Sequence, residues 1–339
     1  MKRIAIMGAG SLGTIFGAYL AKAGRDVELV DANRAHVEAL NRAGAEITGK
    51  VNMTVPVKAV TPEGMTGLYD LIFYLAKQTF NETAVPQMAA HMGPQSVVCT
   101  CQNGLPERAL VEVFGPERVF GAPVGWGATF LGPGRSELTS DPAVMTFYLG
   151  SVDGTVSDKL LETKEIMEDM CPVHLSENLM GIRWMKLLVN ATHSGLSACF
   201  GAPFGKVWDN TRSMRLDVRI GAECLAVAQA MGVSVEPHSQ AGDLREVFVA
   251  DTEEDLCRSM ELVRAAWAPQ RGLIASMAQD LAHGRPCEIG AINGVVCACG
   301  REVGVPTPVN DRVVHVVELI QADELSGSFD NLRFFRDLI

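Results

Sequence analysis

The chain has 339 residues, which corresponds to about two domains of ordinary size. Hydrophobic residues make up 47% and charged residues 20%, a balance that excludes a disordered or fibrous protein. Lysine and arginine number 29 against 40 aspartates and glutamates, so the net charge is −11. Because an acidic surface repels phosphates and anionic lipids, we expect neither nucleic acid nor a membrane as a partner.

The first segment with a strong pattern is the N-terminus. Lys2 and Arg3 precede an uncharged run from Ile4 to Ala21, which imitates a secretory signal or a membrane span. Four glycines interrupt this run in a pattern that has another explanation, given below. We therefore predict a cytoplasmic protein.

That explanation is a G-x-G-x-x-G motif, Gly8-Ala-Gly-Ser-Leu-Gly13, between a predicted strand at 4–7 and a predicted helix through Ala23. In dinucleotide-binding folds the first glycine permits a tight turn and the second lets a pyrophosphate approach the backbone. The third lets the helix pack closely on the strand. N–H groups at the helix start then bind the anion. The predicted cofactor-binding residues here are Gly8, Gly10, Ser11, Leu12 and Gly13.

Asp31 ends the next predicted strand, 27–31, and lies 31 − 13 = 18 residues after the last glycine of the motif. A carboxylate at this position accepts hydrogen bonds from the adenosine ribose and repels a 2′-phosphate, so NAD is the expected cofactor and NADP the alternative. Arg34 would partly offset that repulsion. A second interpretation is that Asp31 only caps a helix that begins near Asn33.

Strands and helices continue to alternate, which predicts a doubly wound parallel sheet. Ligands of such sheets bind at the carboxyl ends of the strands. Lys77 and Asn103 each follow a predicted strand end, so we expect both in the cofactor site. The alternatives are a solvated charge for Lys77 and an ordinary turn for Asn103 before Gly104. The segments concerned are extended stretches at 45–48, 51–60, 70–76 and 96–101, a helix at 82–92, and further strands between 121 and 150.

From about residue 157 the pattern turns helical and stays largely so. The fold class is therefore α/β, with a Rossmann domain over 1–175 and an all-helical domain over 176–325. A tail over 326–339 is expected to be a surface appendage.

One helix of the second half carries a lysine among apolar neighbours. Lys186 and Asn190, four residues apart, share a face of the predicted helix 180–190. Lys186 is either a snorkelling surface side chain or a catalytic ammonium steadied by a carboxylate. Glu288 is a candidate for that carboxylate, and the alternative is an acid that complements a helix dipole.

The nine cysteines are scattered through apolar stretches, and no two have the C-x-x-C spacing of zinc or redox sites. We interpret them as reduced core side chains. Two C-x-C pairs, Cys99 with Cys101 and Cys297 with Cys299, leave metal binding as an alternative. Since no partner pair or histidine cluster accompanies them, we predict no metal site.

Taken in order, these motifs resemble the ketopantoate reductase family from about residue 3 to residue 321. The resemblance implies an N-terminal Rossmann domain, an all-helical C-terminal domain and an active site in the cleft between them. It depends on the glycine motif, Lys77, Gln102-Asn103-Gly104, Trp184-Met-Lys186-Leu-Leu-Val-Asn190, Ser276-Met-Ala-Gln-Asp280, Glu288 and Ile292-Asn293-Gly294.

By this resemblance Lys186 is the general acid, and Glu288 holds it in place and charged. Asn103 and Lys77 bind near the nicotinamide and the substrate, while Asn190 and Ser276 hydrogen-bond the substrate. Ser194 stands where the family usually has a second asparagine, so we include it among the substrate-binding residues and expect an altered pocket. Neighbouring His193 is interpreted as an ordinary, partly buried histidine.

The implied reaction is hydride transfer from a nicotinamide cofactor to the ketone of 2-dehydropantoate, which gives pantoate. The alternative within the same family is an NAD-linked dehydrogenase of another branched or polar 2-oxo or 2-hydroxy acid. A third hypothesis is a non-catalytic nucleotide sensor. A homodimer through the helical half is a further expectation from the resemblance.

Overall fold

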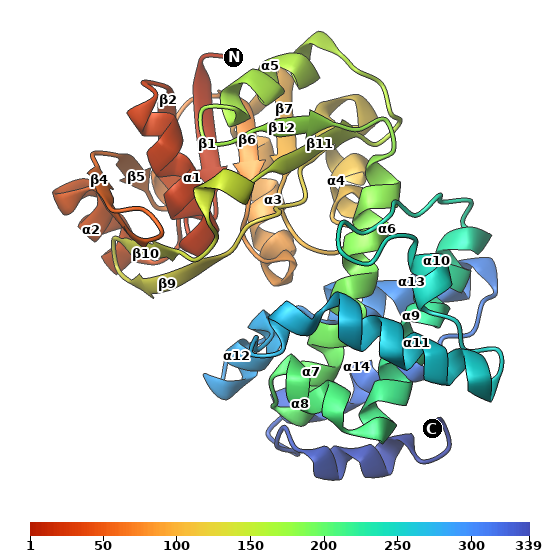
Figure 1. Ribbon diagram of the computed structural model, residues 1–339. Helices are drawn as coiled ribbons and strands as arrows, with labels where there is room; N and C mark the ends of the chain where they lie inside the picture. The colour runs from red at the N-terminus through yellow and green to blue at the C-terminus, as the bar shows by residue number, and fades with distance from the viewer. The chain divides into compact units, whose positions relative to one another are not determined.

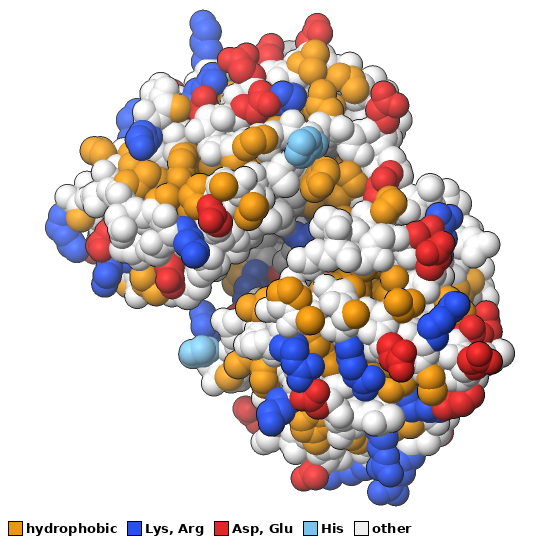
Figure 2. Space-filling view, viewed as in Figure 1, with side chains coloured by type: hydrophobic (Ala, Val, Ile, Leu, Met, Phe, Trp, Pro, Cys, Tyr) orange, Lys and Arg blue, Asp and Glu red, His pale blue; other side chains and the backbone are white.

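The computed structural model describes residues 1–339, which form two compact units. The first unit comprises Met1–Gln102 and Pro106–Leu179, and the second comprises Asn103–Leu105 and Met180–Ile339. Their main boundary lies close to the one predicted after residue 175. Acidic residues outnumber basic ones in each unit, and Figure 2 shows side chains of both signs over the visible face of each.

The first unit is built on an eight-stranded sheet with the order β12-β11-β8-β7-β6-β1-β2-β5. Neighbours pair in parallel except β11, which runs antiparallel to β8. Because β1 lies between β2 and β6, the strand order reverses there, which confirms the predicted doubly wound sheet. The strands are β1 (Arg3–Met7), β2 (Asp26–Val30), β5 (Lys58–Val60), β6 (Tyr69–Tyr74), β7 (Met92–Thr100), β8 (Val119–Gly121), β11 (Phe147–Ser151) and β12 (Val173–Leu175).

Helices cover both faces of this sheet because its strands are apolar on both sides (Figure 1). Ile4 and Ile6 belong to a core that also contains Phe16, whereas the alternate residues Ala5 and Met7 belong to a second core on the other face. Helices α1 (Ser11–Lys22), α2 (Arg34–Ala43) and α5 (Asp158–Met167) contribute to the first core, and α3 (Asn81–Ala90) and α4 (Glu107–Phe114) contribute to the second.

A smaller sheet of four strands, in the order β4-β3-β10-β9, packs against α1. It joins segments that are more than 80 residues apart in the chain, because β3 pairs in parallel with β10. The sequence pattern predicts extended segments here, but the pairing that makes them a second sheet is long-range. The strands are β3 (Ala45–Gly49), β4 (Met53–Val55), β9 (Ala128–Gly132) and β10 (Arg135–Leu138).

The second unit is all-helical, as predicted, and its helices pack around one core that includes Trp184, Trp208 and Cys224. No helix of the chain combines the length and apolar character needed to cross a bilayer. The N-terminal run that imitates a signal forms β1, a turn and α1. Its α-helices and π-helix are α6 (Leu179–Val189), the π-helix η5 (Asn190–Ser194), α7 (Gly195–Phe200), α8 (Phe204–Asp209), α9 (Thr211–Ala230), α10 (Leu244–Val247), α11 (Glu253–Ala266), α12 (Ser276–Ala282), α13 (Asn293–Val303) and α14 (Pro308–Gln321).

Short 3-10 helices connect many of these elements. They are η1 (Pro62–Gly64), η2 (Gln78–Phe80), η3 (Pro116–Arg118), η4 (Pro142–Val144), η6 (Ala268–Gln270), η7 (Ile289–Ala291) and η8 (Phe329–Phe335).

Eight of the nine cysteines are buried with free thiols, and only Cys257 is exposed. Burial raises the pKa of Cys171 to about 11 and that of Cys297 to about 12. These thiols therefore stay protonated near neutral pH, which confirms the interpretation of buried cysteines as core side chains.

The C-terminal tail is not the surface appendage that we expected. Phe335 of η8 is fully buried, and Phe329 stacks on Phe200 with ring centroids 5.0 Å apart. The buried Asn331 donates through Nδ2 to the carbonyl oxygen of Cys199 at 2.9 Å. The tail has little helical periodicity of its own, so its packing depends on rings and carbonyls supplied by α7.

This packing predicts that Phe335→Ala lowers the free energy of unfolding by about 3–5 kcal/mol, as expected for a deleted core ring. Denaturant unfolding measures the change, and Arg336→Ala, at an exposed neighbouring position, is the control. A loss below about 0.5 kcal/mol for Phe335→Ala would show that the tail contributes no core packing.

Candidate functional site

The glycine motif forms the turn between β1 and α1, and the protein's own packing explains two of its glycines. Gly8 has φ +100°, and a Cβ there would lie 2.2 Å from the backbone nitrogen of Ala76. A Cβ on Gly13 would lie 2.1 Å from the carbonyl oxygen of Gly8. Both positions therefore exclude a side chain on steric grounds.

Gly10 is different, because a Cβ built on it meets no atom within 4 Å. Its φ of −63° is also open to any residue. The folded chain alone thus gives no reason for glycine at this position. An approaching ligand backbone or phosphate supplies such a reason.

The start of α1 suits an anion. No side chain caps this helix, and its N-cap residue is Gly10 itself. The first-turn N–H groups, at Ser11, Leu12 and Gly13, have no partner within the helix, and the helix dipole is positive at this end. These features fit the pyrophosphate of a dinucleotide, so the residues present are compatible with the predicted cofactor.

A histidine that sequence reasoning missed fastens this turn. His36 is 1% exposed, and its Nδ1 accepts a hydrogen bond from the Gly134 N–H at 2.8 Å. Its proton is therefore on Nε2, which lies 2.7 Å from the carbonyl oxygen of Ala9. The Thr14 hydroxyl donates to the same oxygen at 2.6 Å. No local sequence signal could have found a link between segments 98 residues apart.

Asp31 directly follows β2 but does not cap α2. Its Oδ1 accepts from the Asn33 N–H at 2.9 Å, while the Asn33 side chain is the cap and accepts from the His36 N–H at 3.2 Å. The alternative in which Asp31 only caps the helix is therefore wrong. Its role toward the ribose stays a prediction.

Lys77 lies at the carboxyl end of β6, beside the glycine turn. The N–H groups of Leu75 and Ala76 donate to the Met7 carbonyl at 2.8 and 3.0 Å, and Lys77 follows as the first residue before η2. Gln102, at the end of β7, donates to the Ala76 carbonyl at 2.6 Å. The structure thus brings the Ala76–Lys77 turn and the glycine motif together within the first unit, whereas Asn103 is grouped with the second.

Gln102 has a clear structural role that sequence reasoning left unassigned. Its side chain is 4% exposed, and its Oε1 accepts from the Thr100 hydroxyl at 3.0 Å. Its Nε2 also lies 3.3 Å from Asn81 Oδ1, which accepts from the Tyr74 hydroxyl at 2.7 Å. The sequence did contain one signal for a role of Gln102, namely its position between a predicted strand end and Asn103.

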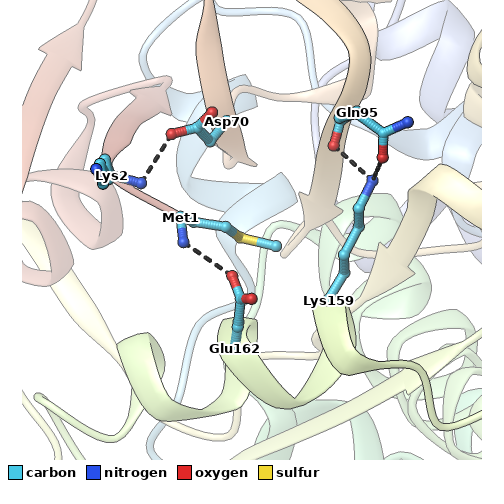
Figure 3. A pocket seen from close by; sticks show the side chains of 6 residues that line it. All are labelled: Met1, Lys2, Asp70, Gln95, Lys159 and Glu162. Carbon is cyan, nitrogen blue, oxygen red and sulfur yellow. Dashed lines mark hydrogen bonds and ion pairs between the residues drawn. The ribbon is translucent and has the colours of Figure 1, made fainter.

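A polar pocket of about 320 Å³ lies at the opposite, amino end of the strands (Figure 3). Its groups already satisfy one another. The Asp70 carboxylate accepts from the Lys2 N–H at 2.7 Å, the terminal amine pairs with Glu162 at 2.8 Å, and Lys159 donates to Gln95. Because ligands bind doubly wound sheets at the carboxyl ends, this pocket is not the candidate site.

In the second unit, Lys186, Asn190 and Ser194 form a stripe on one continuous helical run. All three are partly exposed, whereas Leu187, Leu188 and the residues at 191–193 are buried. Four residues of α-helix rotate a side chain about 40° beyond a full turn, so an 8-residue stripe would drift by about 80°. The wider π-helix at 190–194 reduces this drift and keeps the stripe together.

His193 is fully rather than partly buried, which corrects that expectation. Its Nδ1 lies 2.9 Å from Asp217 Oδ2, and both side chains are at most 1% exposed. Aromatic rings surround it, with the Trp267 centroid 4.8 Å and the Trp208 centroid 5.2 Å away. His193 therefore anchors the π-helix in the core, and no solvent-facing role follows from its position.

Ser276 is the first residue of α12 and is exposed. Helix α12 packs against α7 and the π-helix, and the Ala275 N–H donates to Ser197 Oγ at 3.3 Å. The structure therefore brings the helix of Ser276 against the run that carries Asn190 and Ser194, although 82 residues (276 − 194) separate the two serines.

Glu288 is the N-cap residue of the three-residue helix η7, and its side chain makes no capping bond. Its carbonyl oxygen accepts from the N–H groups of Ala291 and Ile292 at 2.9 and 3.0 Å. It precedes α13 by several residues, which removes it from the first turn of that helix. Its pairing with Lys186 stays a prediction.

Because the space around Gly10 is open, we predict that a side chain there weakens dinucleotide binding without affecting stability. Gly10→Ala should leave the free energy of unfolding unchanged within about 0.5 kcal/mol, since the added methyl meets no protein atom. It should weaken dinucleotide binding about tenfold or more, because the methyl occupies the path of the phosphates. Calorimetric titration with NADH measures this, and Gly272→Ala, at an equally open glycine, is the control. Unchanged NADH affinity in Gly10→Ala would exclude this turn as the binding site.

Comparison with known proteins agrees with these features. Two family models match the chain: "Ketopantoate reductase PanE/ApbA" over residues 4–153 and "Ketopantoate reductase PanE/ApbA C terminal" over residues 178–321. A 2-dehydropantoate 2-reductase of Streptococcus pyogenes serotype M6 is 27% identical over 321 residues, which cover 94% of this chain and 97% of that protein.

Solved structures are similar over nearly the whole chain. A PanE/ApbA family ketopantoate reductase from Ralstonia eutropha JMP134 has a TM-score of 0.80 at 26% identity, covering 95% of this chain and 99% of its own. D-mandelate dehydrogenase with NADH and anilino(oxo)acetate has a TM-score of 0.79 at 22% identity, with coverage of 95% and 99%, and shows a shared fold. The chain therefore belongs to the ketopantoate reductase PanE/ApbA family, and it is an oxidoreductase that uses a nicotinamide cofactor.

Proposed function

We propose that this protein reduces the ketone of a 2-oxo acid, and that 2-dehydropantoate, which gives pantoate, is its substrate. The observation that carries the proposal is that Lys186, Asn190 and Ser194, three polar residues of a largely apolar helical run, are partly exposed and form one stripe. A cation and two hydrogen-bonding side chains in one line suit a molecule with a polarised carbonyl and polar ends. The 2-dehydropantoate 2-reductase from S. pyogenes supports this choice of substrate.

The proposed cofactor is NAD, bound by the glycine turn and Asp31. The Asp31 carboxylate is partly exposed just after β2, where it would accept hydrogen bonds from the ribose hydroxyls and repel a 2′-phosphate. Lys77 and Asn103 are proposed to bind near the nicotinamide. NADP is the alternative, since Arg34 lies exposed at the start of α2.

The proposed chemistry is proton donation by Lys186. A nicotinamide cofactor held by the glycine turn and Asp31 would supply a hydride to the carbonyl carbon. As the C=O bond becomes a single bond, an Nζ proton of Lys186 passes to the oxygen, so that a hydride and a proton together give the alcohol. Before that transfer the ammonium stabilises the charge that develops on the oxygen. Glu288 is proposed to hold Lys186 in place and charged.

Asn190, Ser194 and Ser276 are proposed to bind the polar ends of the substrate. Serine is shorter than the asparagine expected at position 194, so the pocket has more room beside Asn190. This substitution favours a second candidate function, in which another branched or polar 2-oxo acid is the substrate. The expectation of a homodimer stays a prediction.

A substrate panel tests the proposed function. Initial rates with 2-dehydropantoate and a series of other 2-oxo acids, each with NADH and NADPH, should give the highest kcat/KM for 2-dehydropantoate with NADH. If 2-dehydropantoate is turned over no better than the average of the panel, the second candidate function replaces the first. A clear preference for NADPH would show that Asp31 does not select the cofactor.

Removal of the proposed acid gives a second test. Lys186→Ala should lower kcat by roughly 10²–10⁴-fold, because the proton donor is lost. The affinity for NADH should stay the same within about twofold, since the glycine turn and Asp31 are in the other unit. Lys206→Ala, at an exposed lysine of the second unit, is the control. Unchanged turnover in Lys186→Ala would contradict the proposed role and favour the hypothesis of a non-catalytic nucleotide sensor.

A further inference from the structure

The π-helix at 190–194 is held from outside by a side chain of α13. Asn293, which is fully buried, donates through Nδ2 to the carbonyl oxygen of Ala191 at 3.0 Å. A widened turn disturbs the regular hydrogen bonds of an α-helix, so its backbone groups need other partners. Asn293 supplies one in the middle of the turn, between Asn190 and Ser194.

The orientation of the Asn293 amide is itself determined by a chain of hydrogen bonds. The same Nδ2 donates to Asn310 Oδ1 at 2.9 Å, and Asn310 Nδ2 donates to Glu223 Oε2 at 2.7 Å. The carboxylate also accepts from the backbone N–H groups of Val309 and Asn310, at 2.8 and 3.0 Å.

The donors and acceptors in this series of hydrogen bonds can be arranged in only one way. A carboxylate that accepts three N–H groups requires Asn310 to present its nitrogen to Glu223 and therefore its oxygen to Asn293. Asn293 must then present its nitrogen to both Asn310 and Ala191. A reversed Asn293 amide would place its oxygen against two acceptor oxygens. Glu223 on α9 thus determines which atom meets the π-helix.

The other side of the Asn293 amide is constrained by packing. Its Oδ1 is buried and accepts no hydrogen bond, and a Cβ on Gly195 would lie only 2.7 Å from it. The amide therefore fits between the backbone of Gly195 and the carbonyl of Ala191. An unpaired buried oxygen is unfavourable, so Oδ1 does not explain why the amide lies here. The two hydrogen bonds that Nδ2 donates do explain it.

We propose that Asn293 is a positioning residue, which Glu223 and Asn310 orient, and that it holds the widened turn so that Asn190 and Ser194 meet the substrate together. This proposal rests on the proposed function, in which those two side chains bind the 2-oxo acid. Without the bond to Ala191, the turn relaxes toward a regular helix. The stripe then drifts out of line by several tens of degrees, on the order of the 40° per four residues of an α-helix.

The test replaces the donor without changing the shape of the side chain. Asn293→Asp puts an oxygen in the place of Nδ2 and removes both donations. It should raise KM for the 2-oxo acid about tenfold or more, with a smaller loss in kcat and an NADH affinity unchanged within about twofold. Backbone amides of the π-helix, residues 190–194, should exchange with deuterium faster than in the wild type.

The matched control is Asn331→Asp. Asn331 is also buried, and its Nδ2 donates to two carbonyl oxygens, those of Cys199 and Ser326, each at 2.9 Å. This variant loses the same chemistry at the far end of α7, beyond the π-helix, so it should lower stability but leave KM unchanged. If both variants raise KM equally, or if Asn293→Asp leaves KM unchanged, the proposal is overturned.

A second pair of variants covers the case in which Asn293→Asp does not fold. Gly195→Ala displaces the amide by adding a methyl group 2.7 Å from Oδ1, at a helical position that tolerates alanine. It should also raise KM. The control Gly294→Ala adds a methyl group that meets only the Ile289 backbone, 3.4 Å away at the nearest, and should not raise KM. An unchanged KM in Gly195→Ala would overturn the proposal.

If the proposed function itself is wrong, the experiments give a different result from the one that overturns the role of Asn293. The wild type would then turn over no 2-oxo acid in the panel, so no KM could be measured. Hydrogen exchange at 190–194, the π-helix itself, in Asn293→Asp and Asn331→Asp still decides whether Asn293 holds the turn. Equal exchange in these two variants overturns that claim, and faster exchange in Asn293→Asp alone supports it.

Discussion

The close approach of two backbones, Gly8 after β1 and Ala76 after β6, is the constraint on which the first unit depends. A side chain at Gly8 would overlap the Ala76 nitrogen, so the two strand ends can lie side by side only with glycine there. This contact places Lys77 next to the glycine turn at the carboxyl edge of the sheet. His36 and Thr14 then hold the Ala9 carbonyl, which leaves the uncapped start of α1 ready for an anion.

In the second unit, polar side chains rather than a close backbone contact hold the site residues in place. Its stripe of Lys186, Asn190 and Ser194 needs a departure from α-helical geometry, and a widened turn is costly without outside support. That support comes from both sides of the helix. His193 is anchored to Asp217 in an aromatic core, and Asn293 meets the carbonyl of Ala191.

Much of the fold and part of the site could be predicted from the sequence because the signals are local. The strand, glycine turn and helix at 4–23 show in consecutive residues, and so does the amphipathic helix of Lys186. The sequence left capping of α2 open as a second interpretation of Asp31, because Asp31 and Asn33 both suit a cap, and only the backbone geometry shows that Asn33 is the cap. The burial of the C-terminal tail depends on partners in α7, more than 120 residues away, which no local pattern reveals.

By itself the sequence determined the fold class, the nucleotide motif and the helix that bears the lysine, since each depends on hydrophobic periodicity or on residue types within one short segment. Only the tertiary structure decided how these parts are held: His36 against Ala9, Gln102 against Ala76, and the chain from Glu223 through Asn310 to Asn293. Such contacts join polar groups from segments far apart in the chain. Each depends on where an entire strand or helix is packed, which composition and spacing do not specify.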